Sequence, residues 1–251
     1  MLRKPLFLLL LVASIALAQS FRFGVEGGLP LTNAFNTGTS NVVTVFSPES
    51  STTNLNSYSS STRRYTVGAT AELDLPSHLA FKVDVLYKRL GFDFGSSYQE
   101  TCPLDCEAPF PSTTTATTTA NSWEIPLLAK HSVGKLGPLQ PYVEGGIAFR
   151  TVQGVRQTTE MSQPVCVSDC NFPAVTWGTQ TSTAQTSSPA ELNHGFTQGF
   201  VAGAGLELRH LRAGVFGEIR YTHWTADAFS APNGLLKSTR NQADLLMGVT
   251  F

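Results

Sequence analysis

The sequence from residue 64 to residue 88 reads RYTVGATAELDLPSHLAFKVDVLYK. Apolar or aromatic residues occupy every second position from Tyr65 to Leu73 and again from Phe81 to Tyr87, with mostly polar or charged residues between them. A period of two puts the two sets on opposite faces of a strand. Residues 75–78, Leu-Pro-Ser-His, are typical of a turn and keep the register of the two runs, so the segment is predicted to be a β-hairpin.

The same alternation recurs in six other segments, each close to the roughly 9 to 11 residues that a tilted membrane-crossing strand needs. Together with the hairpin they predict eight strands, at Phe21–Leu31, Arg64–Asp74, the run around Phe81–Tyr87, Ser122–Ser132, Gln140–Arg150, Gln198–Arg209, Arg212–Thr222 and Gln242–Phe251. Pro126 cannot donate a ladder hydrogen bond, so we expect a local bulge at that position.

The connectors between these strands alternate in length. Tight turns join the second strand to the third, the fourth to the fifth and the sixth to the seventh, whereas the other connectors are long and polar, at Thr32–Arg63, Phe94–Asn121, Thr151–Thr197 and His223–Asn241. Short periplasmic turns and long outer loops are typical of outer-membrane barrels. The predicted fold is therefore all-β, an eight-stranded antiparallel up-and-down transmembrane β-barrel with long extracellular loops.

Aromatic residues gather at the two ends of the apolar face, as expected for interfacial girdles. At the turn side they are Phe21, Phe23, Phe81 and Phe251, and at the loop side Tyr65, Tyr87, Trp123, Phe149, Phe200 and Tyr221. The alternative is a soluble eight-stranded barrel such as a lipocalin, which would turn the apolar set inward. That barrel would leave four long loops at one end unexplained.

The N-terminus indicates export. Met1–Lys4 carries two positive charges, Leu6–Leu17 is almost wholly apolar, and Ala16-Leu17-Ala18 is a small-x-small cleavage site. Residues 1–18 are predicted to be a cleaved signal peptide and 19–251 one barrel domain in the outer membrane of a Gram-negative-type bacterium. A retained anchor is the alternative, but the run is short for about 30 Å of hydrocarbon.

Composition narrows the classes of partner. The charged fraction is 14% and the net charge is −1, against about 25% charged residues in a typical soluble domain. A basic surface for nucleic acid is not indicated. We expect no cofactor and a monomer, with outer-membrane lipids and the barrel-assembly machinery as partners.

Charged residues lie on the face opposite the apolar one, which points into the lumen. The cations are Arg22, Arg64, Lys82, Lys88, Lys130, Arg150, Arg209 and Arg220, and the carboxylates are Glu26, Glu72, Asp74, Asp84, Glu124, Glu144, Glu207, Glu218 and Asp244. An eight-stranded lumen is just wide enough for side chains, so opposite charges should pair there and plug it. A narrow pore for small solutes is the alternative.

Four cysteines lie only in the long connectors, at Cys102, Cys106, Cys166 and Cys170. In an exported protein an even number predicts disulfides. The equal spacing favours two local bridges, Cys102 with Cys106 and Cys166 with Cys170, over cross-links between the connectors. A four-cysteine zinc site is the alternative.

Two pairs of residues are candidates for catalysis. His131 is adjacent to Ser132, but neighbouring residues of a strand point to opposite faces. His223 and Asp227 lie near the outer rim without a nucleophile placed by the sequence. We expect a non-enzymatic protein, with a lipid-modifying enzyme as the third alternative.

The long connectors are rich in Thr and Ser, for example at Ser112–Thr119. Because Thr is β-prone, such segments could continue as strands above the membrane or stay disordered. Their hydroxyl groups suit contact with an extracellular surface ligand and are equally typical of an inert loop. The predicted role is envelope structure or surface interaction through these connectors.

Three stretches resemble a known superfamily. Trp123–Leu128, WEIPLL, is similar to its aromatic-Glu-Ile-Pro-Leu strand, Pro138–Gly146, PLQPYVEGG, resembles its Pro-Tyr-x-x-x-Gly strand, and the apolar last strand ending on Phe251 looks like its assembly signal. This is the small outer-membrane β-barrel superfamily that includes the membrane domain of OmpA and porin-like barrels. The resemblance implies a barrel, not an activity, and no peptidoglycan-binding domain is expected.

Overall fold

The computed structural model describes residues 20–47, 50–101, 111–134, 136–168, 176–210 and 213–251. The strands within these ranges are β1 (Phe21–Pro30), β2 (Phe35–Thr37), β3 (Thr39–Ser47), β4 (Ser50–Ser60), β5 (Thr66–Leu75), β6 (Leu79–Thr101), β7 (Ser112–Ser132), β8 (Leu139–Ser168), β9 (Thr176–Thr186), β10 (Phe196–His210), β11 (Ala213–Trp224), β12 (Leu236–Ser238) and β13 (Asn241–Thr250). In the described ranges we find no helix that is both long and apolar enough to cross a membrane.

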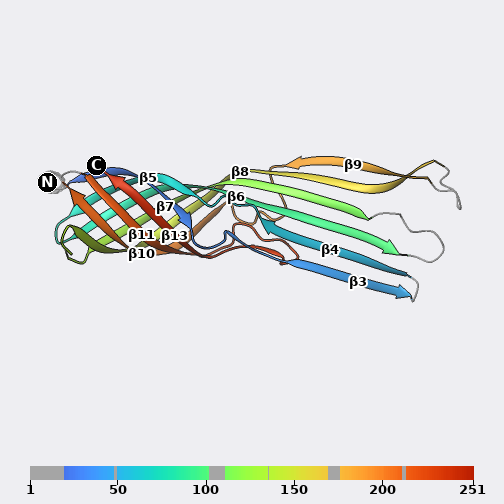
Figure 1. The fold of residues 1–251 in the computed structure, drawn as a ribbon, viewed down its shortest axis with the longest axis horizontal. Helices are drawn as coiled ribbons and strands as arrows, with labels where there is room; N and C mark the ends of the chain where they lie inside the picture. Colours follow the sequence, from blue (N-terminus) through green and yellow to red (C-terminus); the bar gives the residue numbers. More distant parts are fainter. Residues whose placement is uncertain (1–19, 48–49, 102–110, 135, 169–175, 211–212) are drawn as a thin grey trace, which may run out of the picture.

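Eight of the described strands close a barrel (Figure 1). β1 pairs with β13 on one side and β5 on the other, and the ring continues through β6, β7, β8, β10 and β11, with every neighbour antiparallel. Each predicted strand overlaps one of these eight strands. The predicted all-β, eight-stranded antiparallel barrel is therefore confirmed.

The two ends of the barrel differ, and we call them the turn end and the cap end. The turn end holds the connections β5–β6, β7–β8 and β10–β11 and the beginning of β1 and end of β13 (Figure 1). At the first of these turns Ser77 and His78 have φ angles of 67° and 63°, which lets Leu75 pair with Leu79 across the turn. The opposite end is the cap end.

At the cap end three barrel strands continue far beyond the ring (Figure 1). β6, β7 and β8 remain paired there, β4 and β3 are added beside β6, and β9 is added beside β8. We call this six-stranded sheet the extension. The sequence left open whether the Thr-rich connectors continue as strands or stay disordered. In the described residues much of them is strand, including the Thr-rich run of β7, because Thr favours extended backbone.

Pro126 does not produce the expected bulge. Its pairing with Ala148 of β8 keeps a constant register, while on the other side the β6–β7 ladder lapses between Val83↔Leu127 and Leu86↔Glu124 without a shift. The missing N–H of proline removes ladder bonds locally. The prediction of a bulge was wrong, because β7 loses backbone pairs with β6 at this point and no extra residue is inserted into the strand.

The apolar face of the ring is on the outside. Val25, Ile219 and Met247 are 59%, 57% and 62% exposed, whereas Arg220 is 1% exposed in the lumen. Aromatic residues mark both ends, with Phe21 against Phe23 at the turn end and Tyr87 against Trp123 near the cap end. The lipocalin-like alternative, with its apolar set inward, is excluded by this arrangement.

A second apolar core covers the cap end of the barrel. Segments 32–38, 189–195 and 225–240, which we call the cap, are joined by the β2–β12 pair and by the Leu192↔Phe229 bridge. The cap packs on the inner face of the extension, and the buried residues of this core are Phe35, Tyr58, Leu90, Phe92, Ala120, Val152, Val155, Ala228, Phe229, Ala231 and Leu236. The alternating sequence pattern did not predict this core.

Candidate functional site

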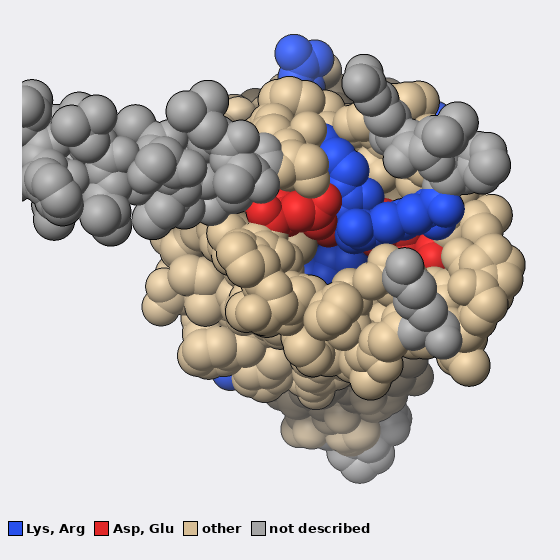
Figure 2. Space-filling model, turned by 90° about the vertical axis from the view of Figure 1, so that its left-hand side faces the viewer, with Lys and Arg blue, Asp and Glu red and all other residues tan. Residues whose placement is uncertain are grey.

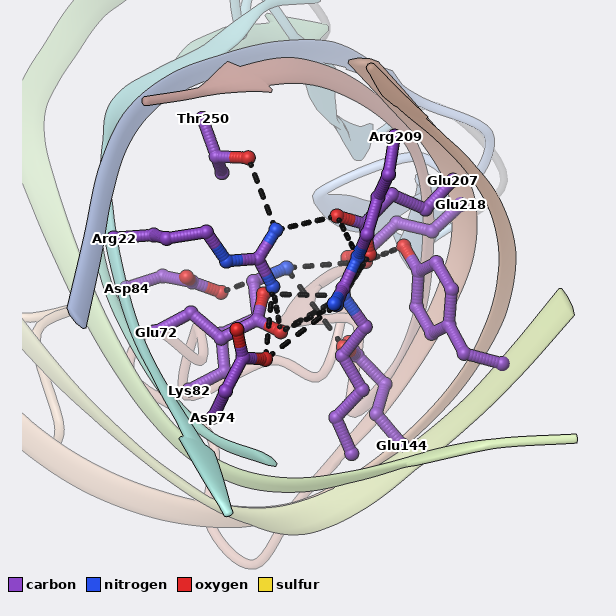
Figure 3. A network of polar contacts seen from close by, with 12 residues as sticks. Arg22, Glu72, Asp74, Lys82, Asp84, Glu144, Glu207, Arg209, Glu218 and Thr250 are labelled. Atoms are coloured by element: carbon purple, nitrogen blue, oxygen red, sulfur yellow. Dashed lines mark hydrogen bonds and ion pairs between the residues drawn. The ribbon is translucent and has the colours of Figure 1, made fainter. Parts of the chain in front are cut away.

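The lumen is the candidate site, because strand alternation directs most of the charged side chains into it (Figure 3). Nearest the turn end is a first layer around Arg22. Its guanidinium binds Glu72 and Glu207, both at 2.6 Å, and Asp74 at 3.1 Å. Lys130 pairs with the same Glu72 and Glu207 at 3.1 and 2.7 Å, so two cations share two carboxylates.

The first layer opens at the turn end as a hollow of about 420 Å³ lined by Arg22, Asp74 and Arg209. Figure 2 shows this mouth, with basic and acidic side chains inside a rim of other residues. Arg209 reaches from the rim to Glu207 at 2.9 Å. The hollow ends on the first layer of ion pairs.

A second layer fills the middle of the barrel around Lys82 and Arg220. Arg220 binds Asp84 at 2.7 Å and Glu144 at 3.3 Å, and it also pairs with Glu218. Lys82 lies 3.1 Å from Glu218, and the hydroxyl of Tyr142 donates to the same carboxylate at 2.7 Å. These side chains come from three different strands, β6, β8 and β11, and the layer therefore ties separate parts of the ring wall together.

The second layer has more carboxylates than cations. Glu26 is its fourth carboxylate, 3.6 Å from Lys82, so four acidic groups face two basic ones. Both oxygens of Glu26 are buried without a hydrogen-bond partner. Leaving a buried polar group unpaired destabilises the fold, so this excess of carboxylates weakens the layer that Arg220 and Lys82 hold together.

A third layer lies toward the cap end. Lys88 pairs with Glu124 and Asp244, both at 3.0 Å. Arg150 lies in the same region, where its Nε donates to the Thr197 hydroxyl at 3.0 Å and its guanidinium stacks 4.2 Å over the ring of Trp224. Arg150 makes no ion pair with any described residue.

One predicted lumen residue lies elsewhere. Arg64 is exposed at the rim before β5 and donates to the Asn33 side chain at 2.9 Å, because β5 begins only at Thr66 and the chain before it leaves the ring. Placing it in the lumen was wrong. Tyr142 and Trp224 were not predicted as lumen residues, although their rings lie 4.2 Å from Lys130 and Arg150. Both stand at inward positions of their strands, and that alternation was the available signal.

The catalytic candidates are engaged with separate partners. The ring of His223 hydrogen-bonds to Asn241 at 2.7 Å. Asp227 accepts from Nε and Nη2 of Arg240 at 2.8 and 2.7 Å, and these hydrogen bonds lower the pKa of Asp227. His131 is exposed and Ser132 buried at the turn end of β7.

The structure describes two of the remaining predicted site residues, Cys166 and Phe251. Cys166 lies near the end of β8 opposite Trp177 of β9, while Cys102, Cys106 and Cys170 lie outside the described residues, as does the predicted signal peptide. The disulfide pairing stays a prediction. Phe251 exchanges two backbone hydrogen bonds with Phe23 at 2.7 and 3.3 Å, and its side chain is exposed beside the last ring strand.

A buried polar cluster joins the extension to the cap. Tyr58 of β4 donates to Glu191 at 3.1 Å, and Gln157 of β8 donates to the other oxygen of Glu191 at 3.2 Å. Burial, with the nearby Glu191 carboxylate, raises the pKa of Tyr58. Among the described residues as a whole, no group of three or more His, Cys, Asp or Glu side chains is placed to hold a metal ion.

Comparison with known proteins gives a family match and distant similarities to solved structures. The chain matches the model of a family described as outer membrane protein β-barrel domain over residues 17–223. Comparison with curated proteins gives no match. Similar solved structures include the translocator domain of the autotransporter NalP from Neisseria meningitidis, with 10% identity and a TM-score of 0.25 over 99% of this chain and 95% of that chain. Another is OmpT, an outer membrane protein of Vibrio cholerae, with 7% identity and a TM-score of 0.17 over 93% and 96%. At these TM-scores neither structure adds to the argument.

Proposed function

The chain belongs to the outer membrane protein β-barrel domain family, and we propose that it is a closed, non-enzymatic barrel that anchors the extension outside the outer membrane for surface interaction. The exposed apolar belt contacts outer-membrane lipids, and the exposed Phe251 beside the last ring strand serves the barrel-assembly machinery. The signal peptide directs export, and the barrel works as a monomer because every strand of its ring pairs with a ring neighbour on both sides.

The observation that carries the closed-barrel proposal is the second layer of the lumen. Its members Glu26, Lys82, Asp84, Tyr142, Glu144, Glu218 and Arg220 are each 5% exposed or less. A charge network this tightly packed leaves no room for a hydrated ion in an eight-stranded ring. The cap covers the other end of the same lumen.

A planar-bilayer measurement tests this proposal. Refolded native protein is expected to show no steady unitary conductance. The variant Lys82→Ser with Glu218→Ser removes one cation and its 3.1 Å partner together, so the net charge of the layer is unchanged while its side-chain volume falls, and this variant is expected to leak. Reproducible channels from the native protein that change in Glu144→Gln or Arg220→Gln would instead favour the narrow pore.

The extension supports the surface role. Its edge strand β3 pairs only with β4 among the described strands, and Val45 and Phe46 of β3 are 67% and 68% exposed. Unpaired strand edges with exposed apolar side chains readily bind other surfaces. In a host that lacks the protein, its expression is expected to increase cell adhesion, and Val45→Thr with Phe46→Ser should abolish the increase. Met161→Thr, a change of an exposed apolar residue of β8, is the matched control.

The enzyme alternative has its own readout. Altered lipid A in the expressing host, lost in His223→Ala, would support a lipid-modifying activity and contradict the non-enzymatic proposal. We expect unaltered lipid A, because His223 hydrogen-bonds to Asn241 and Asp227 to Arg240 rather than to each other.

A further inference from the structure

The barrel wall has a gap near the cap end. Pairing between β1 and β5 ends at Gly28↔Thr66. The chain that follows β1 and the chain that precedes β5 pair again only in β3 and β4, from Thr39↔Ser57 onward. Between these two points the chain after β1 first stays beside β13, since the Leu31 amide donates to the Ala243 carbonyl, and then enters the cap. The chain between β4 and β5 stays beside β6, since the Ser61 amide donates to the Gly91 carbonyl. The two sides therefore diverge.

Behind the gap is a cavity of about 290 Å³ that reaches the third layer of the lumen. Lys88, Arg150, Glu124 and Asp244 form its lumen side, with two cations and two carboxylates. Arg63 and Arg64 line it from the diverging segment and are both exposed. The cavity as a whole has two more positive than negative side chains.

Arg150 is the unsatisfied group of this cavity. It is 3% exposed, and its Nη2 is buried without a hydrogen-bond partner. Glu124, its cross-strand neighbour, is paired with Lys88, and no carboxylate oxygen of the described residues lies within 4.0 Å of the guanidinium. A buried arginine without an anion is costly, and a guanidinium binds phosphate or carboxylate oxygens in a bidentate way.

We propose that this cavity binds a phosphate monoester, with Arg150 as its inner partner and Arg63 and Arg64 at its entrance. A phosphate monoester carries about −1.5 to −2 charges at pH 7, which matches the excess of two positive charges. The three acceptor oxygens would satisfy Nη2 of Arg150 and leave oxygens for the two arginines at the entrance. This site is separate from the proposed surface role of the extension.

The position of the gap defines two sources for the phosphate group. Tyr65, which also lines the cavity, comes two residues before Val67, and Val67 pairs with Tyr87, one of the aromatic residues near the cap end. Aromatic residues mark the headgroup level of a bilayer. A phosphorylated lipid headgroup can therefore enter sideways through the gap, and a soluble phosphate ester can enter from the aqueous side.

Trp224 provides a reporter, because the Arg150 guanidinium lies 4.2 Å over its ring. In the background Trp123→Phe with Trp177→Phe, Trp224 is the one remaining tryptophan of the three in the sequence. The detergent-solubilised protein is titrated with glucose 6-phosphate, and with glucose as the uncharged control. For the lipid source, emission is compared in phosphatidylcholine nanodiscs with and without diphosphoryl lipid A.

A saturable change of Trp224 emission with glucose 6-phosphate or with lipid A, absent with glucose or phosphatidylcholine alone, is expected. A response to lipid A alone identifies the headgroup, and a response to both identifies the phosphate group itself. Arg150→Gln should abolish the response. Arg63→Gln with Arg64→Gln, at exposed positions that leave folding intact, should weaken binding by about tenfold or more, since each charge-assisted hydrogen bond contributes substantially.

The matched control is Arg89→Gln with Arg156→Gln, which removes two exposed arginines that do not line the cavity. This variant should bind as the parent does. The proposal is overturned if neither phosphate source changes the emission, or if the two double variants bind equally well.

Discussion

Arg220 and Arg150 are both buried arginines of the lumen, at 1% and 3% exposure, but their surroundings differ. Arg220 contacts three carboxylates, whereas Arg150 contacts a hydroxyl and an aromatic ring. A buried charge that is fully paired holds a structure together, and one that is not is available for a ligand. The same residue type therefore has a structural role in one layer and a binding role in the next.

The first prediction concerns the charge balance of the second layer. Arg220→Gln leaves four buried carboxylates with Lys82 alone and should lower the free energy of unfolding by about 3–5 kcal/mol. Glu26→Gln removes a carboxylate whose oxygens have no hydrogen-bond partner and should change it by less than about 1 kcal/mol. Urea unfolding in lipid vesicles measures both. Equal losses in the two variants would contradict the role given to Arg220.

The second prediction concerns acid and the cap. The hydrogen bonds from Arg240 lower the pKa of Asp227, so the folded carboxyl ionises more readily than the unfolded one. The stabilisation of the folded state by this interaction is fully present above the unfolded pKa of about 3.9, and it is lost as the pH falls through the lower pKa of the folded carboxyl. Hydrogen-exchange protection of the Asn193 and His194 amides, which donate to Ala228, should therefore fall below about pH 4.

Asp227→Asn is the control for this prediction. The amide cannot titrate, so its cap should be less protected at neutral pH and show no further loss in acid. An unchanged pH profile in Asp227→Asn would assign the acid effect to another group.

At the level of single strands, β10 shows how the ring makes room for its filling. Gly205 faces the lumen beside Tyr142, and a Cβ there would lie 2.5 Å from Cζ of that ring and 2.6 Å from the carbonyl oxygen of Gly217. A strand that crosses a crowded lumen therefore needs glycine at this position. Tyr142 in turn can reach Glu218 and cover Lys130.

The third prediction follows from this close approach. Gly205→Ala should lower the free energy of unfolding by about 1–3 kcal/mol through overpacking. Gly217→Ala on the neighbouring strand is the control, because its Cβ would come no closer than 4.0 Å to the nearest atom, the Leu246 carbonyl oxygen. That variant should be neutral or more stable by up to about 1 kcal/mol. Equal thermal unfolding of both variants would rule out crowding at Gly205.

The molecule as a whole combines two interiors of opposite character. The barrel buries charges and exposes an apolar belt, whereas the cap and the inner face of the extension bury aromatic and aliphatic side chains. The first interior suits a wall surrounded by lipid, where the hydrophobic residues face outward. The second is built like the core of a water-soluble domain, where burial of apolar surface stabilises the fold.

The fourth prediction separates these two interiors. Phe229 is fully buried, with its ring centroid 5.8 Å from that of Phe35 and 5.5 Å from that of Phe92. Phe229→Ala should cost about 3–5 kcal/mol within the cap. Hydrogen exchange should speed up at the Ser230 and Ala231 amides while the ring strands keep their protection.

Phe46→Ala, at an exposed phenylalanine of β3, is the control for Phe229→Ala and should leave the cap unchanged. Loss of protection in β1 and β13 of the Phe229 variant would mean that barrel and cap unfold as one unit.

The sequence by itself determined the ring, because a period of two is a local pattern that assigns each residue of a strand to the lipid or to the lumen. It therefore predicted the eight strands and the inward position of nearly all the lumen charges. Only the tertiary structure decided the rest. The partners of Arg220, the unpaired state of Arg150, the cap over the barrel and the gap beside Tyr65 all depend on contacts between residues far apart in the chain, and alternation along one strand carries no information about the strand across the lumen.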